Sequence, residues 1–129
     1  MNNRSRALRI AALAFLLAAS TGLRAAENKY GAPGSVIHVV TVQWKQDSTP
    51  EQRTAALEGV KKMAAEIPGI KNVWIKATRV QPREYHAAFA IEFESPAAAE
   101  AYADHSAHRA WEKIYIPIRE ESRSQQITN

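Results

Sequence analysis

The chain has 129 residues, which fits a single domain, and it contains no cysteine. The missing cysteine excludes lipoprotein processing and suits an oxidising compartment, where a free thiol would be a liability. The formal net charge of +4 arises in the first 25 residues, because four of the 17 Lys and Arg and none of the 13 Asp and Glu lie there. The remaining 104 residues carry 13 charges of each sign. The composition therefore gives no support to a nucleic-acid-binding function.

The N-terminal segment has the three-part layout of a secretory signal peptide. Arg4, Arg6 and Arg9 form a basic start, residues 10–19 form an uncharged apolar run, and small residues follow. The apolar run is shorter than the roughly 20 residues that a transmembrane helix needs. A membrane anchor is thus the weaker alternative.

We expect residues 1–25 to be removed as a signal peptide, with cleavage near Ala25, and Gly22 or Ala26 as alternative cleavage positions. The mature protein is then periplasmic or secreted. Residues 26–35 are rich in Gly and Pro and predict a flexible lead-in to the folded domain.

Residues 36–44 (VIHVVTVQW) predict a β-strand, because they are dense in β-branched side chains. Both faces of this strand are largely apolar, and a strand that is apolar on both sides is covered on both sides. We therefore expect an interior strand. One face carries Val36, His38, Val40, Val42 and Trp44, and the other carries Ile37, Val39 and Thr41.

A helix is predicted to begin at Thr49 and Pro50 and to end at Pro68 and Gly69. A capping box can form in either of two registers, from Ser48 to Glu51 or from Thr49 to Gln52. Apolar residues recur at helical spacing on one face of this segment. They are Ala56, Val60, Met63, Ala64 and Ile67.

Two further strands are predicted on either side of a turn at residues 81–84. Residues 71–80 alternate weakly between apolar and polar side chains, whereas residues 85–94 alternate clearly. Because successive side chains of a strand point to opposite faces, the second of these strands should direct one apolar set toward the core. That set is Tyr85, Ala87, Phe89, Ile91 and Phe93.

Another helix is predicted from Ser95, which can cap it, and Pro96, which suits the first helical position. If the helix continues to His108, then His105 lies about 60° and His108 about 120° around the axis from Tyr102, on the same side. A phenol and two imidazoles are then presented to whatever the helix covers. Residues 109–118 are ambiguous but compatible with a helix, and residues 121–128 are compatible with a short last strand.

The predicted order is β-α-β-β-α-β, which is the ferredoxin-like α+β arrangement of an antiparallel sheet with both helices on one face. The other face of the sheet carries apolar residues and needs a cover, since soluble monomers rarely expose a large apolar patch. An identical sheet provides that cover most simply, so we expect a homodimer with two-fold symmetry.

The sequence resembles the stress-responsive A/B barrel (Dabb) domain family over residues 36–129. The matching pieces occur in order, and they are VIHVV at 36–40, STPEQ at 48–52, IPGI at 67–70, FAIEFES at 89–95 and YADHSAH at 102–108. The resemblance implies a dimeric α+β barrel, in which two ferredoxin-like sheets pack together, with a small cavity between sheet and helices. It implies no single activity, because one fold hosts several.

One group of this family consists of polyketide cyclases that close a ring by aldol condensation without a cofactor. The resemblance implies that their catalytic Tyr and His fall on Tyr102 and His108 here, and that their first-strand His falls on His38. A third-strand His of those enzymes falls on Ala87, one place after His86.

Two interpretations of Tyr102 and His108 remain open. An imidazole can take a proton from a carbon next to a carbonyl while a phenol hydrogen-bonds the developing enolate oxygen. Alternatively both residues pack in the core, with His108 near carbonyl groups at a helix end. His38 is likewise either a hydrogen-bonded core histidine or a residue of a ligand cavity.

His105 joins His38 as a candidate ligand-binding residue. His105 and His108 are three residues apart and would provide half of a zinc site, together with Asp104 or Glu100, but no third ligand is obvious at suitable spacing. We therefore expect no metal.

These observations favour an exported domain protein that binds a small hydrophobic molecule in its cavity, without nucleic acid and without a stable membrane span. The alternative is a cofactor-independent cyclase or lyase-type enzyme on a small carbonyl compound, with His108 as base and Tyr102 as acid. Export argues against a polyketide substrate, since those intermediates are made on cytoplasmic carriers.

Overall fold

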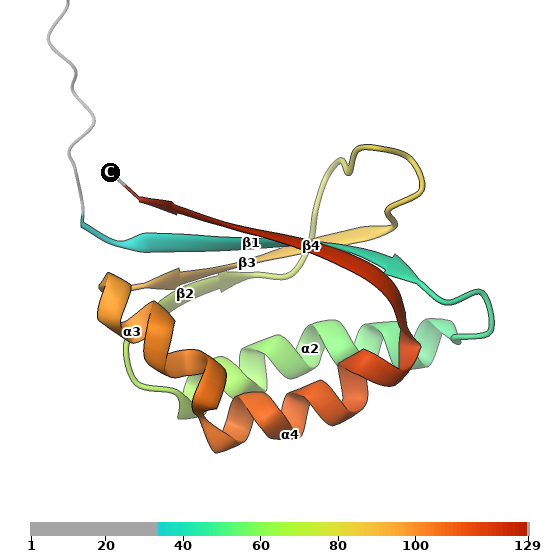
Figure 1. The fold of residues 1–129 in the computed structure, drawn as a ribbon. Coiled ribbons are helices and arrows are strands. Elements are labelled where there is room, and N and C mark those ends of the chain that lie inside the picture. The colour runs from blue at the N-terminus through green and yellow to red at the C-terminus, as the bar shows by residue number, and fades with distance from the viewer. Residues whose placement is uncertain (1–33, 129) are drawn as a thin grey trace, which may run out of the picture. The chain divides into compact units, whose positions relative to one another are not determined.

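The computed structural model describes residues 34–128. The predicted signal peptide (1–25) and nearly all of the predicted lead-in (26–33) lie outside the described residues. The described elements follow the predicted order, with short helical segments added late in the chain (Figure 1). They are β1 (Val36–Trp44), α2 (Pro50–Glu66), β2 (Ile70–Trp74), β3 (Ala87–Phe93), α3 (Pro96–Ala101), the 3₁₀ turn η1 (Tyr102–Asp104), α4 (Ser106–Tyr115), the 3₁₀ turn η2 (Ile116–Ile118) and β4 (Arg119–Thr128).

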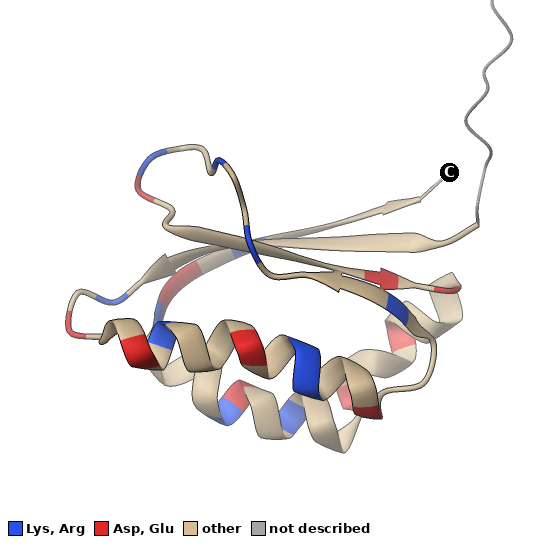
Figure 2. Ribbon diagram, turned by 180° about the vertical axis from the view of Figure 1, so that it is seen from behind, with Lys and Arg blue, Asp and Glu red and all other residues tan. Residues whose placement is uncertain are grey.

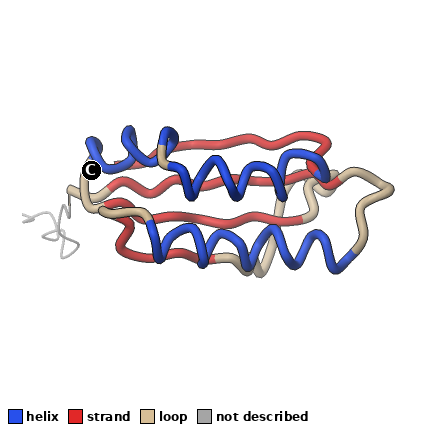
Figure 3. The backbone as a smooth tube through the Cα atoms, turned by 90° about the horizontal axis from the view of Figure 1, so that it is seen from below, coloured by secondary structure: helices blue, strands red, loops and turns tan. Residues whose placement is uncertain are grey.

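The strands form one antiparallel sheet in the order β2-β3-β1-β4, and the helices lie together on one face of it (Figures 1 and 3). β1 pairs with β3 on one side and with β4 on the other. The predicted ferredoxin-like α+β fold and the interior position of the first strand are thus confirmed. β4 is an edge strand, which matters for the site described below.

The core lies between the helices and the inward face of the sheet. The residue pairs Val40–Phe89 and Val36–Phe93 stand opposite each other on β1 and β3 and are buried. The inward set predicted for the first strand is buried apart from His38, which is half-buried. The opposite face carries Ile37 and Val39.

Helix α2 begins with a capping box in the second of the two predicted registers. The Thr49 side chain accepts a hydrogen bond from the Gln52 backbone N–H, and the Gln52 side chain accepts one from the Thr49 N–H. The chain leaves the helix through Gly69, whose φ of +83° suits glycine. A Cβ on Gly69 would also lie 2.6 Å from the Ala98 Cβ, so the close approach of α3 requires glycine there.

The second strand is shorter than predicted, because β2 ends at Trp74 and residues 75–86 form a loop. The pairing of β2 with β3 stops at Trp74 and Ala90, although β3 itself extends to Ala87. The weak alternation after Trp74 therefore did not indicate a strand.

Tyr85 was predicted to share the inward face with Phe89, and this prediction is wrong. The Tyr85 hydroxyl donates to Glu121 Oε1 at 2.5 Å, and the Arg123 guanidinium lies 5.2 Å from its ring centroid. Glu121 and Arg123 pair with the outward-facing residues of β1. Because Tyr85 precedes β3, the alternation of the strand does not extend to it, and its ring covers the opposite face of the sheet.

The helix predicted from Ser95 to His108 is broken. Ser95 caps α3 as expected, but the chain passes through η1, and His105 adopts extended backbone angles (φ −69°, ψ 141°) as the N-cap of α4. The predicted angular positions of His105 and His108 about one axis are therefore wrong. Polar residues that bond their own backbone favour such a break, and the His105 side chain accepts from the Ala107 N–H.

Charged residues of both signs alternate along the outer surfaces of α2 and α4 (Figure 2). This is the usual pattern of a solvated helix face. No helix within residues 34–128 is long and apolar enough to cross a membrane.

Candidate functional site

A cavity of about 130 Å³ lies between the helices and the half of the sheet formed by β1 and β4. Ser122 and Ser124 of β4 line it, and they pair with Val42 and Val40 of β1 on the inward face. Because serine is far smaller than the large apolar residues found elsewhere in the core, these two positions leave space unfilled. The walls are Val40, Phe89 and Trp111.

Tyr102, His108 and His38 meet at one end of the cavity. The ring centroids of Tyr102 and His108 are 4.4 Å apart, and those of Tyr102 and His38 are 5.9 Å apart. On an unbroken helix Tyr102 and His108 would be separated by about 9 Å along the axis. The break at His105 is therefore what brings the two rings together.

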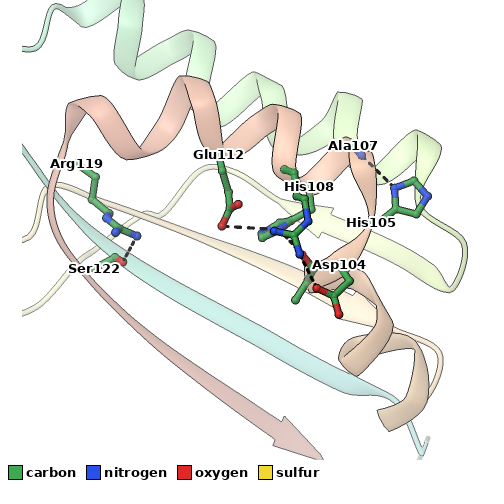
Figure 4. A network of polar contacts seen from close by, with 9 residues as sticks. Asp104, His105, Ala107, His108, Glu112, Arg119 and Ser122 are labelled. Carbon is green, nitrogen blue, oxygen red and sulfur yellow. Dashed lines mark hydrogen bonds and ion pairs between the residues drawn. The ribbon is translucent and has the colours of Figure 1, made fainter.

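The hydrogen bond of His108 defines the chemical state of its ring. His108 Nδ1 lies 3.0 Å from the backbone carbonyl oxygen of Ala103, and a carbonyl can only accept. Nδ1 therefore carries the proton and donates it, so that Nε2 of the neutral ring holds the lone pair. The Glu112 carboxylate lies 3.9 Å from Nδ1 and would stabilise the imidazolium if Nε2 took up a proton (Figure 4).

Tyr102 is held as a neutral phenol. Burial raises the pKa of Tyr102 to about 12, and the negative charge of Glu112 adds to this shift. Its ring also packs 5.0 Å from that of Phe93. A phenol that keeps its proton can donate a hydrogen bond to a ligand oxygen.

His38 lies on the inward face of β1, and burial lowers its pKa, with the neighbouring His108 adding to the shift. Its Nδ1 atom is buried and has no hydrogen-bond partner among the described residues. Unpartnered buried nitrogens are rare, so hydrogen bonding is incomplete at this point of the core.

Tyr115, Arg119 and the two serines line another part of the cavity. The hydroxyl of Tyr115 is buried and makes no hydrogen bond of full geometry within residues 34–128. Burial raises the pKa of Tyr115, while the hydrogen-bonding groups of Ser122 and Arg119 beside the hydroxyl lower it. The Arg119 guanidinium lies 5.2 Å from the Tyr115 ring centroid, and its Nη1 donates to Ser122 Oγ at 3.2 Å.

His105 does not join the other candidate residues. It is not among the residues that line the cavity, and its Nδ1 atom accepts from the Ala107 N–H at 3.1 Å. Figure 4 shows it beyond His108, at the opposite end of the view from Arg119. Its role in the structure is to cap α4.

The remaining histidine also lies outside the cavity. His86 is exposed, and its Nδ1 accepts from the Trp44 N–H, while the neighbouring Ala87 packs against the core. In the described range, no three His, Cys, Asp or Glu side chains are grouped so that they could hold a metal ion.

Sequence reasoning did not single out several residues of the cavity. Glu112 and Tyr115 lie four and seven residues after His108, a spacing that places all three on one face of a helix. Ser122 and Ser124 alternate on the inward side of the last strand. Both patterns were readable, but only after the helix and strand boundaries were known.

The chain is similar to proteins of known family and fold. The sequence model of the Stress Responsive A/B Barrel Domain family matches residues 36–126. No curated protein matches the chain. A Dabb family protein with a ferredoxin-like fold from Mesorhizobium loti is 25% identical, with a TM-score of 0.64 over 74% of this chain and 97% of that one.

Two other solved structures share the fold. A dimeric ferredoxin-like protein of unknown function from Thermobifida fusca is 23% identical, with a TM-score of 0.64 over 79% of this chain and 97% of that one. A hydroxynitrile lyase from Passiflora edulis is 16% identical, with a TM-score of 0.66 over 75% of this chain and 94% of that one. The family match spans most of the chain and agrees with the observed fold. The chain therefore belongs to the stress-responsive A/B barrel (Dabb) domain family.

Proposed function

We propose that this protein binds a small, largely apolar molecule bearing a carbonyl group in the cavity between helices and sheet. One observation carries the proposal: the polar side chains of Tyr102, His108 and His38 line one cavity that also has apolar walls. A few polar groups that converge in a largely apolar cavity are typical of a small-molecule site.

The cavity suits a ligand with one ring. Its volume of about 130 Å³ is close to that of the roughly 150 Å³ engineered cavities that take up benzene in other proteins. Phe89 and Trp111 provide an apolar wall, and the neutral Tyr102 phenol provides a donor for a carbonyl oxygen. Benzaldehyde combines these features and is a suitable probe.

Isothermal titration with benzaldehyde tests the proposal. We expect saturable binding to the wild type and weaker binding to Tyr102→Phe, which lacks the donor. Tyr85→Phe is the matched control, because it removes a phenol from the opposite face of the sheet, and it should bind as the wild type does. Equal affinity of the wild type and Tyr102→Phe would remove Tyr102 from the site, and absence of binding would contradict the proposal.

A second candidate function, acid–base catalysis on a carbonyl compound, is favoured by the tautomer of His108. Its Nδ1–H is committed to the Ala103 carbonyl, which leaves Nε2 as the basic nitrogen of a ring whose centroid lies 4.4 Å from that of Tyr102. Nε2 would take a proton from the carbon beside the carbonyl, and the Tyr102 hydroxyl would hydrogen-bond the enolate oxygen. The hydroxynitrile lyase from Passiflora edulis has the same fold, and this shared fold supports the enzyme candidate.

A proton-exchange measurement separates catalysis from binding. The protein is incubated with acetophenone in deuterium oxide, and NMR follows the replacement by deuterium of the proton on the carbon beside the carbonyl. An enzyme should accelerate the exchange, and the Tyr102→Phe/His108→Ala double variant should return it to the buffer rate. Exchange at the same rate with and without the wild-type protein would leave binding alone.

We propose further that the protein is a homodimer formed by the open face of the sheet. Ile37, Val39, Trp74 and Ile127 lie on that face, and Trp74 and Ile127 are 46% and 55% exposed. An apolar sheet face of this kind marks an interface. The Thermobifida fusca protein of the same fold is described as dimeric.

We also propose export, on the basis of the N-terminal sequence alone. Expression of the full chain in a Gram-negative host, followed by mass spectrometry of the periplasmic fraction, tests it. Export predicts a mature N-terminus at Ala26. Full-length protein retained in the cytoplasm would contradict it.

A further inference from the structure

The end of the cavity formed by Tyr115, Arg119, Ser122 and Ser124 is rich in hydrogen-bond donors. Arg119 Nη1 donates to Ser122 Oγ, and the Tyr115 hydroxyl lies beside the hydrogen-bonding groups of both residues. A guanidinium has five N–H donors, so these two hydroxyls leave donors that an acceptor on a ligand would satisfy.

The charge of Arg119 is not neutralised by any ion pair within residues 34–128. By contrast, Arg109 on α4 and Arg123 on β4 itself each pair with a carboxylate, at 2.6 Å and 3.1 Å. Arg119 instead lies over the Tyr115 ring, half-buried at the cavity. A guanidinium held in this way is prepared for a carboxylate, with which it can form two parallel hydrogen bonds.

Glu112 is the acidic residue that lines the cavity. Figure 4 shows it between Arg119 and His108, and its carboxylate lies 3.9 Å from His108 Nδ1. It does not form an ion pair with Arg119. Its negative charge would weaken the binding of an anion. Removal of that charge should therefore strengthen anion binding, which is the opposite of the effect of removing the charge of Arg119.

We propose that Arg119, Ser122 and the Tyr115 hydroxyl form a carboxylate subsite, so that the ligand is a compact aromatic carboxylic acid. Its ring would lie against Phe89 and Trp111, and an aldehyde or ketone group on it would approach Tyr102 and His108. This inference rests on the proposed small-molecule function and narrows it to an anionic class of ligand.

Titration of benzoate and of benzaldehyde into the same protein tests the subsite separately from the cavity. The wild type should bind benzoate more tightly than benzaldehyde. Arg119→Gln should weaken benzoate binding by about tenfold or more, because a charge-assisted pair is lost, and should leave benzaldehyde affinity within about twofold, since a neutral carbonyl gains little from the cation. Glu112→Gln should strengthen benzoate binding.

Arg109→Gln is the matched control, because it removes an exposed cation from α4 and should change neither affinity. Ser122→Ala provides a second variant if Arg119→Gln does not fold, as judged by circular dichroism, and it should weaken benzoate selectively. Benzaldehyde binding without benzoate binding, or benzoate binding unaffected by Arg119→Gln, would overturn the subsite and leave the proposed function intact. Binding of neither compound would overturn both.

Discussion

Tyr102 and His108 owe their proximity to a break in the helix, and their chemical states to their immediate neighbours. The Ala103 carbonyl lies in η1, so the same break that brings the rings to 4.4 Å also provides the acceptor for His108 Nδ1. Burial keeps Tyr102 protonated. A neutral phenol and an imidazole thus line one cavity.

The shifted pKa of Tyr102 predicts a loss of stability at high pH. Its folded pKa of about 12 lies above the ordinary value of 10, so the protonated form is favoured by folding. The contribution is complete below pH 10 and is lost as the pH rises toward 12, by roughly 2 kcal/mol. Chemical unfolding at pH 9 and 11 should show a smaller drop for Tyr102→Phe than for the wild type. Equal drops would contradict the shift.

The lowered pKa of His38 predicts the opposite dependence, at low pH. Because burial favours the neutral ring, stability is complete above the ordinary value of 6.5 and falls as the pH drops through the folded pKa. His38→Gln should flatten the dependence of unfolding free energy on pH below 6.5. His86→Gln, which changes an exposed histidine, is the control and should retain the wild-type dependence.

At this scale the sequence predicted part of the site. The family resemblance indicated His38, Tyr102 and His108, and the structure places all three at the cavity. The candidate His105 is a helix cap instead. No local pattern distinguished a histidine that lines the cavity from one that caps a helix. The difference depends on the helix break, which the polar residues there permit but do not require.

The packing of α2 against α4 forms one wall of the cavity. Trp111 Nε1 donates to the Ala56 carbonyl at 2.8 Å, and its ring stacks on Tyr115 at 4.5 Å. The ring is also 5.7 Å from that of Phe89 in an edge-on arrangement. Trp111 is therefore fixed from three sides, and Gly59 provides the space that its indole needs.

Gly59→Ala should destabilise the protein, although alanine is the better helix former. A Cβ at Gly59 would lie 2.8 Å from Trp111 Cδ1. Overpacking costs about 1–3 kcal/mol, which exceeds the gain of about 1 kcal/mol from helix propensity. Urea unfolding measures the difference.

Trp111→Phe in the Gly59→Ala background is the internal control for that clash. Phenylalanine lacks the five-membered ring that the added Cβ would meet, so the cost of the glycine substitution should be smaller there than in the wild type. A Gly59→Ala variant more stable than the wild type would show that the two helices can move apart.

Elements with a strong periodic pattern were predicted well, and irregular ones were not. The first strand and the first helix have the predicted bounds within a residue or two, because β-branched density and a capping box mark them locally. The second strand is half the predicted length, because its pairing with β3 stops at Trp74 and Ala90. The turn between α3 and α4 depends likewise on tertiary contacts.

The helices cover one face of the sheet, and the other face is open. The oligomeric state therefore tests whether a second copy covers the open face. Val39 lies near the centre of β1 on that face, between Ala90 and Gln125. Val39→Glu should convert the proposed dimer into a monomer, because burying an unpaired carboxylate in an interface is costly. Sedimentation equilibrium at micromolar concentration measures the mass.

Glu58→Lys on the exposed face of α2 is the control and should leave the mass unchanged. A wild-type protein that sediments as a monomer would contradict the dimer. The order of the elements and the single helical layer were both predictable from the hydrophobic pattern. The position of the cavity was not, because it depends on two serines of the edge strand.

The central claim is that this cavity binds a small carbonyl compound, and a crystal structure grown with 4-bromobenzaldehyde tests it most directly. The anomalous signal of bromine locates the molecule without ambiguity. We predict a single strong peak among Phe89, Trp111 and Tyr115, with the aldehyde oxygen within hydrogen-bond distance of Tyr102 or His38. Bromine found on the protein surface alone, with ordered water filling the cavity, would contradict the account.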